Sequence, residues 1–361
     1  MAAYMVFLHH FIPAEGPVPN TRWEYIFGEL HVGVTFFFVL SGFLIHHRYS
    51  QIDQVERQWY WNYMSNRVAR IIPLFFILTC LTFAFNYFFH RNDQGNFGKN
   101  LGLWLMNISL IKGFFPEFIF TGIAQTWSLT VEFCFYALAP FLFTRKRNIL
   151  LYPLVSAVLL LFGFGLVAIC SQLPVKEFFG DNQFMLTYSF PGRSFEFFAG
   201  CYLSDRLGDW SKERRPNGYF TYTSFAFILL LIFCLSLVRQ PQIYGVHTFP
   251  GLIINNFFLP LMILLFFRGL LFERTFISQM FASKAGQLLG KASYAFYLIH
   301  VGFIEIGLHH FISRNVLVLF VLLNIISICL YLWVEEPLNI KVKGWLVKKK
   351  ATPIGVASSI M

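Results

Sequence analysis

The stretch GVTFFFVLSGFLI, residues 33–45, decides the fold class of this chain. It carries no charged residue and lies in a longer apolar segment, 29–47, close to the roughly 20 residues that a helix needs to cross a bilayer. Similar segments recur along all 361 residues, of which 57% are hydrophobic and only 13% charged. A soluble domain carries about a quarter charged residues. The sequence therefore predicts an all-α, polytopic transmembrane helical bundle.

The connections between the apolar segments alternate in charge. We predict about ten spans, at residues 1–13, 29–47, 71–89, 127–143, 149–171, 184–203, 221–238, 250–267, 292–308 and 315–334. One alternate set of connections holds 20 Lys and Arg residues and the other set holds 7. Because such residues concentrate on the cytoplasmic side, both termini are predicted to be cytoplasmic. The net charge of +10 is thus topological and indicates no nucleic-acid partner.

Two shorter segments need separate interpretations. Leu101–Lys112 is apolar but too short to span, so we expect an interfacial or re-entrant piece on the outer side. Residues 341–361 form a short basic tail after the membrane domain, 1–340, and are expected to lie against anionic lipid in the cytoplasm. The expected location is an integral, multi-pass position in the plasma (inner) membrane.

Ionisable side chains inside spans are costly and mark functional sites. Those predicted at middle to outer depth are His9, His10, Glu132, Arg193, Glu196 and His300. Their shared depth predicts a reaction site within the membrane. Arg193 and Glu196 also fit a purely structural interpretation, because residues three apart on a helix can neutralise one another.

Arg67 and Arg70 lie at the cytoplasmic mouth of the third span. They could hold phosphates of a cytoplasmic substrate, or they could only enforce topology. Ser41 and Gly42 form a small polar step in the second span, although a glycine there also permits close helix packing. The six cysteines are scattered without metal-ligand spacing, so no metal is expected.

Several blocks in order resemble the acyltransferase 3 family of integral-membrane acyltransferases, which O-acylate exported glycans and related molecules. The first span, AAYMVFLHHF, is similar to the family's histidine-bearing first span. Further matching blocks are GVTFFFVLSGFLI, NRVARIIPLFF, TWSLTVEFCFYALAP (Thr126–Pro140), SYAFYLIH (Ser293–His300) and the closing Val334–Pro337. The resemblance runs nearly end to end.

The resemblance implies transfer of an acyl group, most simply acetyl from cytoplasmic acetyl-CoA, to a carbohydrate hydroxyl. His10 is the expected general base, with Glu132 orienting it, or His10 itself carries the acyl group covalently. Arg67 and Arg70 would bind the CoA phosphates, and Ser41 and Gly42 would line the passage of the acyl arm. Substrate-binding roles are also expected for Arg193, at the thioester oxyanion, and for Glu196 and His300.

The sequence departs from the family pattern at two places. The family has an Arg separated by ten residues from the first-span His, a position that here falls before Met1. We expect either residues upstream of Met1 or a copy lacking that motif residue. The family commonly has an acidic residue where this chain has Thr35.

Two other function classes compete with acyl transfer. A secondary transporter also buries His, Glu and Arg, but its paired halves are not visible as a repeat here. A structural scaffold leaves the buried charges without a role.

Overall fold

The structure, a computed structural model, describes residues 1–12, 21–49, 55–89, 97–143, 150–172, 178–210, 217–240 and 243–348. In these ranges the chain is helical, apart from loops and one isolated bridge between Gln240 and Ile243. Six helical segments of the described part are long and apolar enough to cross a membrane: Arg22–Tyr49, Arg57–Phe89, Leu151–Cys170, Tyr219–Val238, Phe249–Phe272 and Val316–Leu346. The all-α membrane bundle is thereby confirmed. The number of ten spans and the side of the termini stay predictions.

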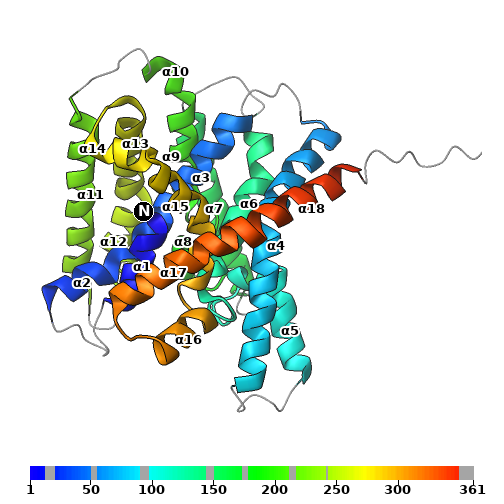
Figure 1. The fold of residues 1–361 in the computed structure, drawn as a ribbon. Helices are drawn as coiled ribbons and strands as arrows, with labels where there is room; N and C mark the ends of the chain where they lie inside the picture. Colours follow the sequence, from blue (N-terminus) through cyan, green and yellow to red (C-terminus); the bar gives the residue numbers. More distant parts are fainter. Residues whose placement is uncertain are drawn as a thin grey trace, which may run out of the picture.

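The elements follow one another as a series of long helices joined by short ones (Figure 1). They are α1 (Ala2–Phe11), α2 (Arg22–Gly28), η1 (Glu29–Val32), α3 (Gly33–Tyr49), α4 (Arg57–Phe89), α5 (Phe97–Ile108), η3 (Ile111–Phe114), η4 (Ala124–Thr126), α6 (Trp127–Phe143), α7 (Leu151–Cys170), α8 (Asn182–Tyr188), α9 (Ser194–Asp205), α10 (Leu207–Trp210), α11 (Tyr219–Val238), η6 (Gly245–His247), α12 (Phe249–Ile253), η7 (Ile254–Phe258), α13 (Leu259–Phe272), α14 (Phe276–Ala282), α15 (Lys284–Ile299), α16 (Phe303–Phe311), α17 (Val316–Leu330), η8 (Tyr331–Glu335) and α18 (Glu336–Lys348).

Helix α3 packs against α9 with the two backbones in direct contact. A Cβ added to Gly42 would lie 1.9 Å from the carbonyl oxygen of Phe197, and one added to Gly200 would lie 1.9 Å from that of Val39. No larger residue fits at either position without separating the helices. The structure thus places Gly42 at a close helix–helix contact, where small residues of membrane helices are common.

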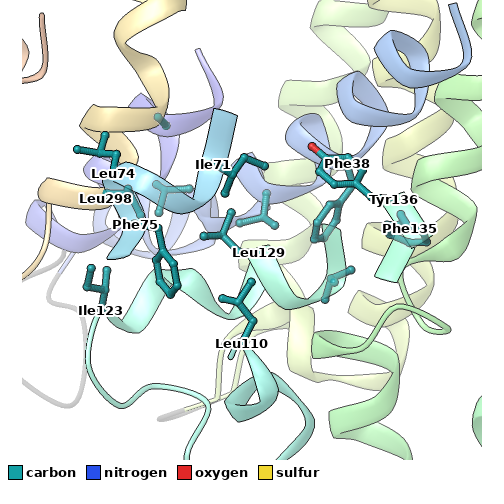
Figure 2. Packing of buried hydrophobic residues seen from close by; sticks show 14 of the residues in the cluster. Phe38, Ile71, Leu74, Phe75, Leu110, Ile123, Leu129, Phe135, Tyr136 and Leu298 are labelled. Carbon is teal, nitrogen blue, oxygen red and sulfur yellow. The ribbon is translucent and has the colours of Figure 1, made fainter. Parts of the chain in front are cut away.

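The main hydrophobic core lies between α3, α4, α6 and α15. Figure 2 shows Phe38, Phe75, Leu129 and Phe135 from this core. The rings of Phe135 and Phe197 stack with centroids 4.4 Å apart, which joins α6 to the α3–α9 pair. This packing fixes the relative positions of the helices that carry the predicted site residues.

Two predicted spans are interrupted rather than continuous. Span 184–203 breaks between α8 and α9, where Pro191 has no N–H to continue the helix. Span 292–308 breaks after His300, at Gly302, whose φ of 124° is open mainly to glycine. Each break leaves an ionisable residue at a helix end, with Arg193 at the start of α9 and His300 at the end of α15. The predicted continuous boundaries were wrong at both places.

Two other predicted spans contain π-helical turns. Residues Ile254–Phe258 separate α12 from α13, and residues Tyr331–Glu335 separate α17 from α18. Such turns insert one extra residue and often occur at functional sites. Helix α18 continues to Lys348, so the predicted boundary between residues 340 and 341 falls inside a helix.

The short predicted segment Leu101–Lys112 forms the C-terminal two turns of α5 and enters η3. Helix α5 has 12 residues and packs beside α4. Its length agrees with a segment that does not span, and its interfacial position stays a prediction.

Candidate active site

The polar residues of the site are arranged in levels along α3. Thr35, near the start of this helix, is fully buried and has polar contacts with three residues of two other elements, η7 and α9. Its Oγ1 donates to Asn255 Oδ1 at 3.0 Å and lies 3.4 Å from Glu196 Oε1, and Arg193 Nη2 donates to Thr35 Oγ1 at 3.0 Å. Arg193 Nη1 donates to Asn256 Oδ1 at 3.2 Å, and its Nε lies 3.1 Å from Glu196 Oε2.

This network surrounds a buried ion pair, Arg193–Glu196, inside the bundle. Arg193 is 3% exposed and Glu196 is 0% exposed, so neither charge is solvated by water. Two adjacent residues of the π-helical turn at 254–258 join this network: Asn256 Oδ1 accepts from Arg193, and Asn255 Oδ1 accepts from Thr35. The local backbone irregularity thus supplies the polar partners that the buried charges need.

Two histidines, His9 and His31, meet at the outer end of α3, by the predicted orientation of the chain. His9 Nδ1 lies 2.7 Å and His31 Nδ1 lies 3.2 Å from the same carbonyl oxygen, that of Gly28. Because a carbonyl can only accept, both rings carry their proton on Nδ1. Tyr244 packs on both rings, at centroid distances of 5.1 Å and 5.6 Å.

His10 follows His9 on α1 and reaches toward α15, with its ring centroid 4.8 Å from that of His9. Its ring is exposed and lies 5.5 Å from the ring of His300, which is 0% exposed. The structure therefore brings together two predicted site residues from the first and ninth predicted spans. His9 remains a hydrogen-bonding neighbour, as expected for adjacent positions of one helix.

Glu132 lies at the next level of α3 and does not contact His10 among the described residues. It accepts a hydrogen bond from Ser41 Oγ at 3.1 Å and another from the hydroxyl of Tyr136. It is 3% exposed. The expected pairing of Glu132 with His10 is therefore absent from this structure, because α6 directs the carboxyl group toward Ser41.

Arg67 lies beyond Glu132, near the end of α3. Its Nη2 donates to the hydroxyl of Tyr49 at 3.1 Å, and its guanidinium lies 5.9 Å from the ring of Tyr63 and 5.6 Å from that of Tyr136. These rings hold a cation that is only 7% exposed. Tyr136 also bonds Glu132, so it joins the two predicted site residues.

Arg67 and the exposed Arg70 both line a polar pocket of about 240 Å³ between α4 and α18. Its other lining residues are Arg48, Asn66, Lys291, Tyr331, Glu335, Glu336, Asn339 and Lys343. The pocket combines five cations with two carboxylates. Such a lining suits an anionic group that also carries hydrogen-bond donors.

A second, apolar cavity of about 410 Å³ lies between α1, α3, α13, α14 and α15. From α3 it is lined by Gly33, Val34, Phe36, Phe37, Leu40 and Phe43, and from α15 by Gly290, Ser293, Tyr294 and Tyr297. Ser41 and Gly42, expected to line a passage, instead bond Glu132 and pack on Phe197.

Several residues of these networks are not predicted from the sequence, because they are neither ionisable in an apolar span nor part of the Ser41–Gly42 step. The pair Asn255–Asn256 was visible as two amides in an apolar span and could have been found. Tyr49, Tyr136 and Gln125 had no signal, because aromatic and isolated amide residues are common in membrane helices.

The fold and the site define a polytopic membrane protein with buried titratable side chains at two levels and a charged pocket at one end. The chain belongs to the acyltransferase 3 family, whose model, that of an acyltransferase domain, matches residues 1–335.

Two curated relatives have related names. The chain is 24% identical over 296 residues to the peptidoglycan O-acetyltransferase OatA of Listeria monocytogenes serovar 1/2a, covering 74% of this chain and 44% of the relative. It is 23% identical over 356 residues to the O-acetyltransferase OatA of Staphylococcus aureus strain MRSA252, covering 89% and 55%. The chain thus spans about half the length of these relatives. No solved structure gives a significant match.

Proposed function

We propose that this protein is a membrane O-acetyltransferase that moves an acetyl group from cytoplasmic acetyl-CoA to a hydroxyl of a cell-surface or exported carbohydrate. The observation that carries the proposal is the family match across residues 1–335, joined to the names of the two relatives. The printed name of the Listeria relative, a peptidoglycan O-acetyltransferase, supports a glycan as the acceptor. The membrane is the plasma (inner) membrane.

The donor binds in the polar pocket between α4 and α18. Acyl-CoA presents phosphates, which Arg67 and Arg70 can bind bidentately, while Lys291 and Lys343 add charge at the rim. The adenine amino group can donate hydrogen bonds to carboxylates of the pocket such as Glu335. The Lys and Arg asymmetry supports a cytoplasmic location for this pocket.

The acetyl group must travel from that pocket to His10. Helix α3 has 17 residues and is therefore about 25 Å long. The apolar cavity lies between these ends, and its wall includes Val6, one turn before His10, and Tyr297, three residues before His300. The cavity suits the uncharged arm and acetyl group of the donor and not its phosphates.

At the outer site a carbohydrate hydroxyl must lose a proton as it attacks the thioester carbon. His10 takes that proton and passes it to the departing CoA sulfur, which balances the reaction. A covalent relay, with the acetyl group first on His10, is the second route to the same products. Arg193 stabilises the oxyanion only if it can leave part of its present hydrogen-bond network.

Membrane vesicles of defined orientation test the function and the donor side together. Inside-out vesicles given external labelled acetyl-CoA should acetylate an enclosed glycan acceptor, whereas right-side-out vesicles should not. Vesicles from cells carrying the His10→Ala variant are the control. Uptake of label without acetylated acceptor would contradict the proposal and favour a transporter.

Removing either arginine of the polar pocket should weaken donor binding. We expect Arg67→Ala and Arg70→Ala to raise the apparent KM for acetyl-CoA about tenfold or more, with a smaller fall in kcat, because the phosphate contact is made equally in the ground and transition states. Added salt should weaken donor binding more in the parent than in either variant.

Arg57→Ala is the matched control for these variants. Arg57 is an exposed arginine at the start of the same helix and lies outside the pocket lining. An unchanged KM in both pocket variants would return Arg67 and Arg70 to a purely topological role.

A further inference from the structure

The break after α15 leaves one nitrogen of His300 without a partner. His300 is 0% exposed and its Nδ1 lies 2.8 Å from the carbonyl oxygen of Tyr297. Because that oxygen can only accept, the proton of the neutral ring is on Nδ1, and Nε2 carries a lone pair. Among the described residues, the buried Nε2 has no hydrogen-bond partner. A buried acceptor left unpaired costs stability and therefore indicates a missing donor.

The neighbouring polar ring is that of His10, 5.5 Å away between centroids and tilted by 44°. Two other rings lie close to His300: Phe296 stacks on it at an interplanar angle of 1° and offers no donor, and Tyr297 lies 5.7 Å away but donates its hydroxyl hydrogen to the Gln125 carbonyl. A small rotation of the exposed His10 side chain would bring one of its N–H groups to Nε2 of His300.

We propose that His300 is the positioning residue for His10, and that Gln125 holds His300 in place for this role. His300 Nε2 accepts a hydrogen bond from one ring N–H of His10, which leaves the other His10 nitrogen free to take the acceptor proton. The inference rests on the proposed function, because it assigns His10 the reacting nitrogen. It assigns to His300 the orienting role that the sequence had suggested for Glu132.

Gln125 holds the end of α15 through its side chain. Its Nε2 donates to the carbonyl oxygens of Tyr297 at 2.9 Å, Leu298 at 3.1 Å and Val301 at 3.3 Å. Helix-terminal carbonyls lack partners inside the helix, so one amide satisfies several of them. The amide orientation is fixed by this environment, because a flipped Gln125 would place its oxygen against these carbonyls.

The backbone of Gln125 completes the attachment. Its carbonyl oxygen accepts a hydrogen bond from the hydroxyl of Tyr297 at 2.8 Å. The Tyr297 carbonyl therefore receives both the Gln125 amide and the His300 ring, and a carbonyl with two lone pairs can accept both. Gln125 thus fixes the atom that sets the protonated nitrogen of His300.

A buried lysine holds the loop that precedes Gln125. Lys112 is 0% exposed, and its Nζ donates to the carbonyl oxygens of Thr121 at 2.6 Å and Ile123 at 2.9 Å. Burial lowers the pKa of Lys112 to about 7.

Purified parent and variants should be compared in acetyl transfer to a soluble oligosaccharide acceptor. Gln125→Met keeps the size of the side chain and removes its donors. We expect kcat to fall about 10- to 100-fold with donor KM changed less than twofold, because the support of a reacting group affects the chemical step. Gln287→Met is the matched control, since Gln287 lies at the exposed start of α15 and its side-chain amide donates to the carbonyl of Ala282, far from His300 in the sequence.

Substitutions of His300 separate positioning from the other roles. His300→Gln retains an amide oxygen that can accept the His10 N–H, so it should retain several-fold more kcat than His300→Ala, whereas His10→Gln should have none. A His300→Gln variant as inactive as His10→Gln would make His300 the base and overturn the proposal. A rise in acceptor KM at unchanged kcat would make it a substrate-binding residue and overturn it equally.

The outcome also separates this inference from the proposed function. If the parent transfers no acetyl group, the proposed function fails. If the parent is active and His10→Ala is not, while Gln125→Met and His300→Ala both match the parent, only the positioning role fails. The unfolding temperature of each variant, measured in detergent solution, shows whether a fall in kcat is caused by unfolding of the protein.

Discussion

Acetyl transfer is expected to disappear when His10 is replaced by alanine, at comparable protein levels in the membrane. A positioned base contributes about two to four powers of ten to such a reaction, so the loss should exceed 100-fold. His10→Gln should be equally inactive, because an amide fills the space and forms hydrogen bonds but cannot take the proton. The measurement is labelled acetyl transfer to glycan by purified protein.

His9→Ala is the control for that result. His9 donates to the Gly28 carbonyl and packs beside His31 and Tyr244, so its removal loosens the contact of α1 with α2 without removing the base. We expect a measurable fraction of activity to remain. An essential His9 with a dispensable His10 would show that the first span is aligned one residue out of register.

Removing Arg193 alone should cause the largest loss of stability of any substitution considered for this protein. Arg193→Met leaves Glu196 buried without its cation, and breaking a buried pair in this way costs about 3 to 5 kcal/mol. We expect a strong fall in the temperature of unfolding in detergent. The double variant Arg193→Met/Glu196→Gln should recover part of the loss, because the remaining amide carries no charge.

The exposed pair Arg206–Asp209 has the same spacing and gives the comparison. Its atoms lie 2.8 Å apart, yet water screens such a surface pair, so Arg206→Met should be nearly neutral. A stable but inactive double variant of Arg193 and Glu196 would assign Arg193 a role in catalysis. Equal stability of Arg193→Met and the parent would contradict the structural interpretation of the pair.

The sequence predicted the helical membrane fold because hydrophobic length and charge asymmetry are local properties of each segment. It also predicted His10, Arg67 and Arg193 as candidate site residues, since ionisable residues in apolar segments stand out individually, and their roles stay predictions. It could not identify the partner of Glu132, because which face of α6 meets α3 depends on packing. The expected partner was His10, and the structure instead gives Ser41 and Tyr136.

The helix interruptions were harder to predict for a different reason. Pro191 and Gly302 permit a break, but an apolar segment containing either residue can also continue as a kinked helix. The breaks occur where Arg193 and His300 have backbone and side-chain partners at a helix end. Likewise, the π-helical turn carries Asn255 and Asn256 into hydrogen bonds with Thr35 and Arg193, and these partners are distant in the sequence.

The contact of Gly42 with the Phe197 carbonyl has a consequence for how the protein can move. A shift of α9 along α3 by about one helical turn would place Val39 or Ile45 where the hydrogen of Gly42 now fits, so these two helices cannot slide past each other. They form a rigid body, and Thr35, Ser41, Arg193 and Glu196 keep a fixed spacing on it. A conformational cycle that admits substrates from opposite sides would therefore have to displace the surrounding helices about a stationary pair.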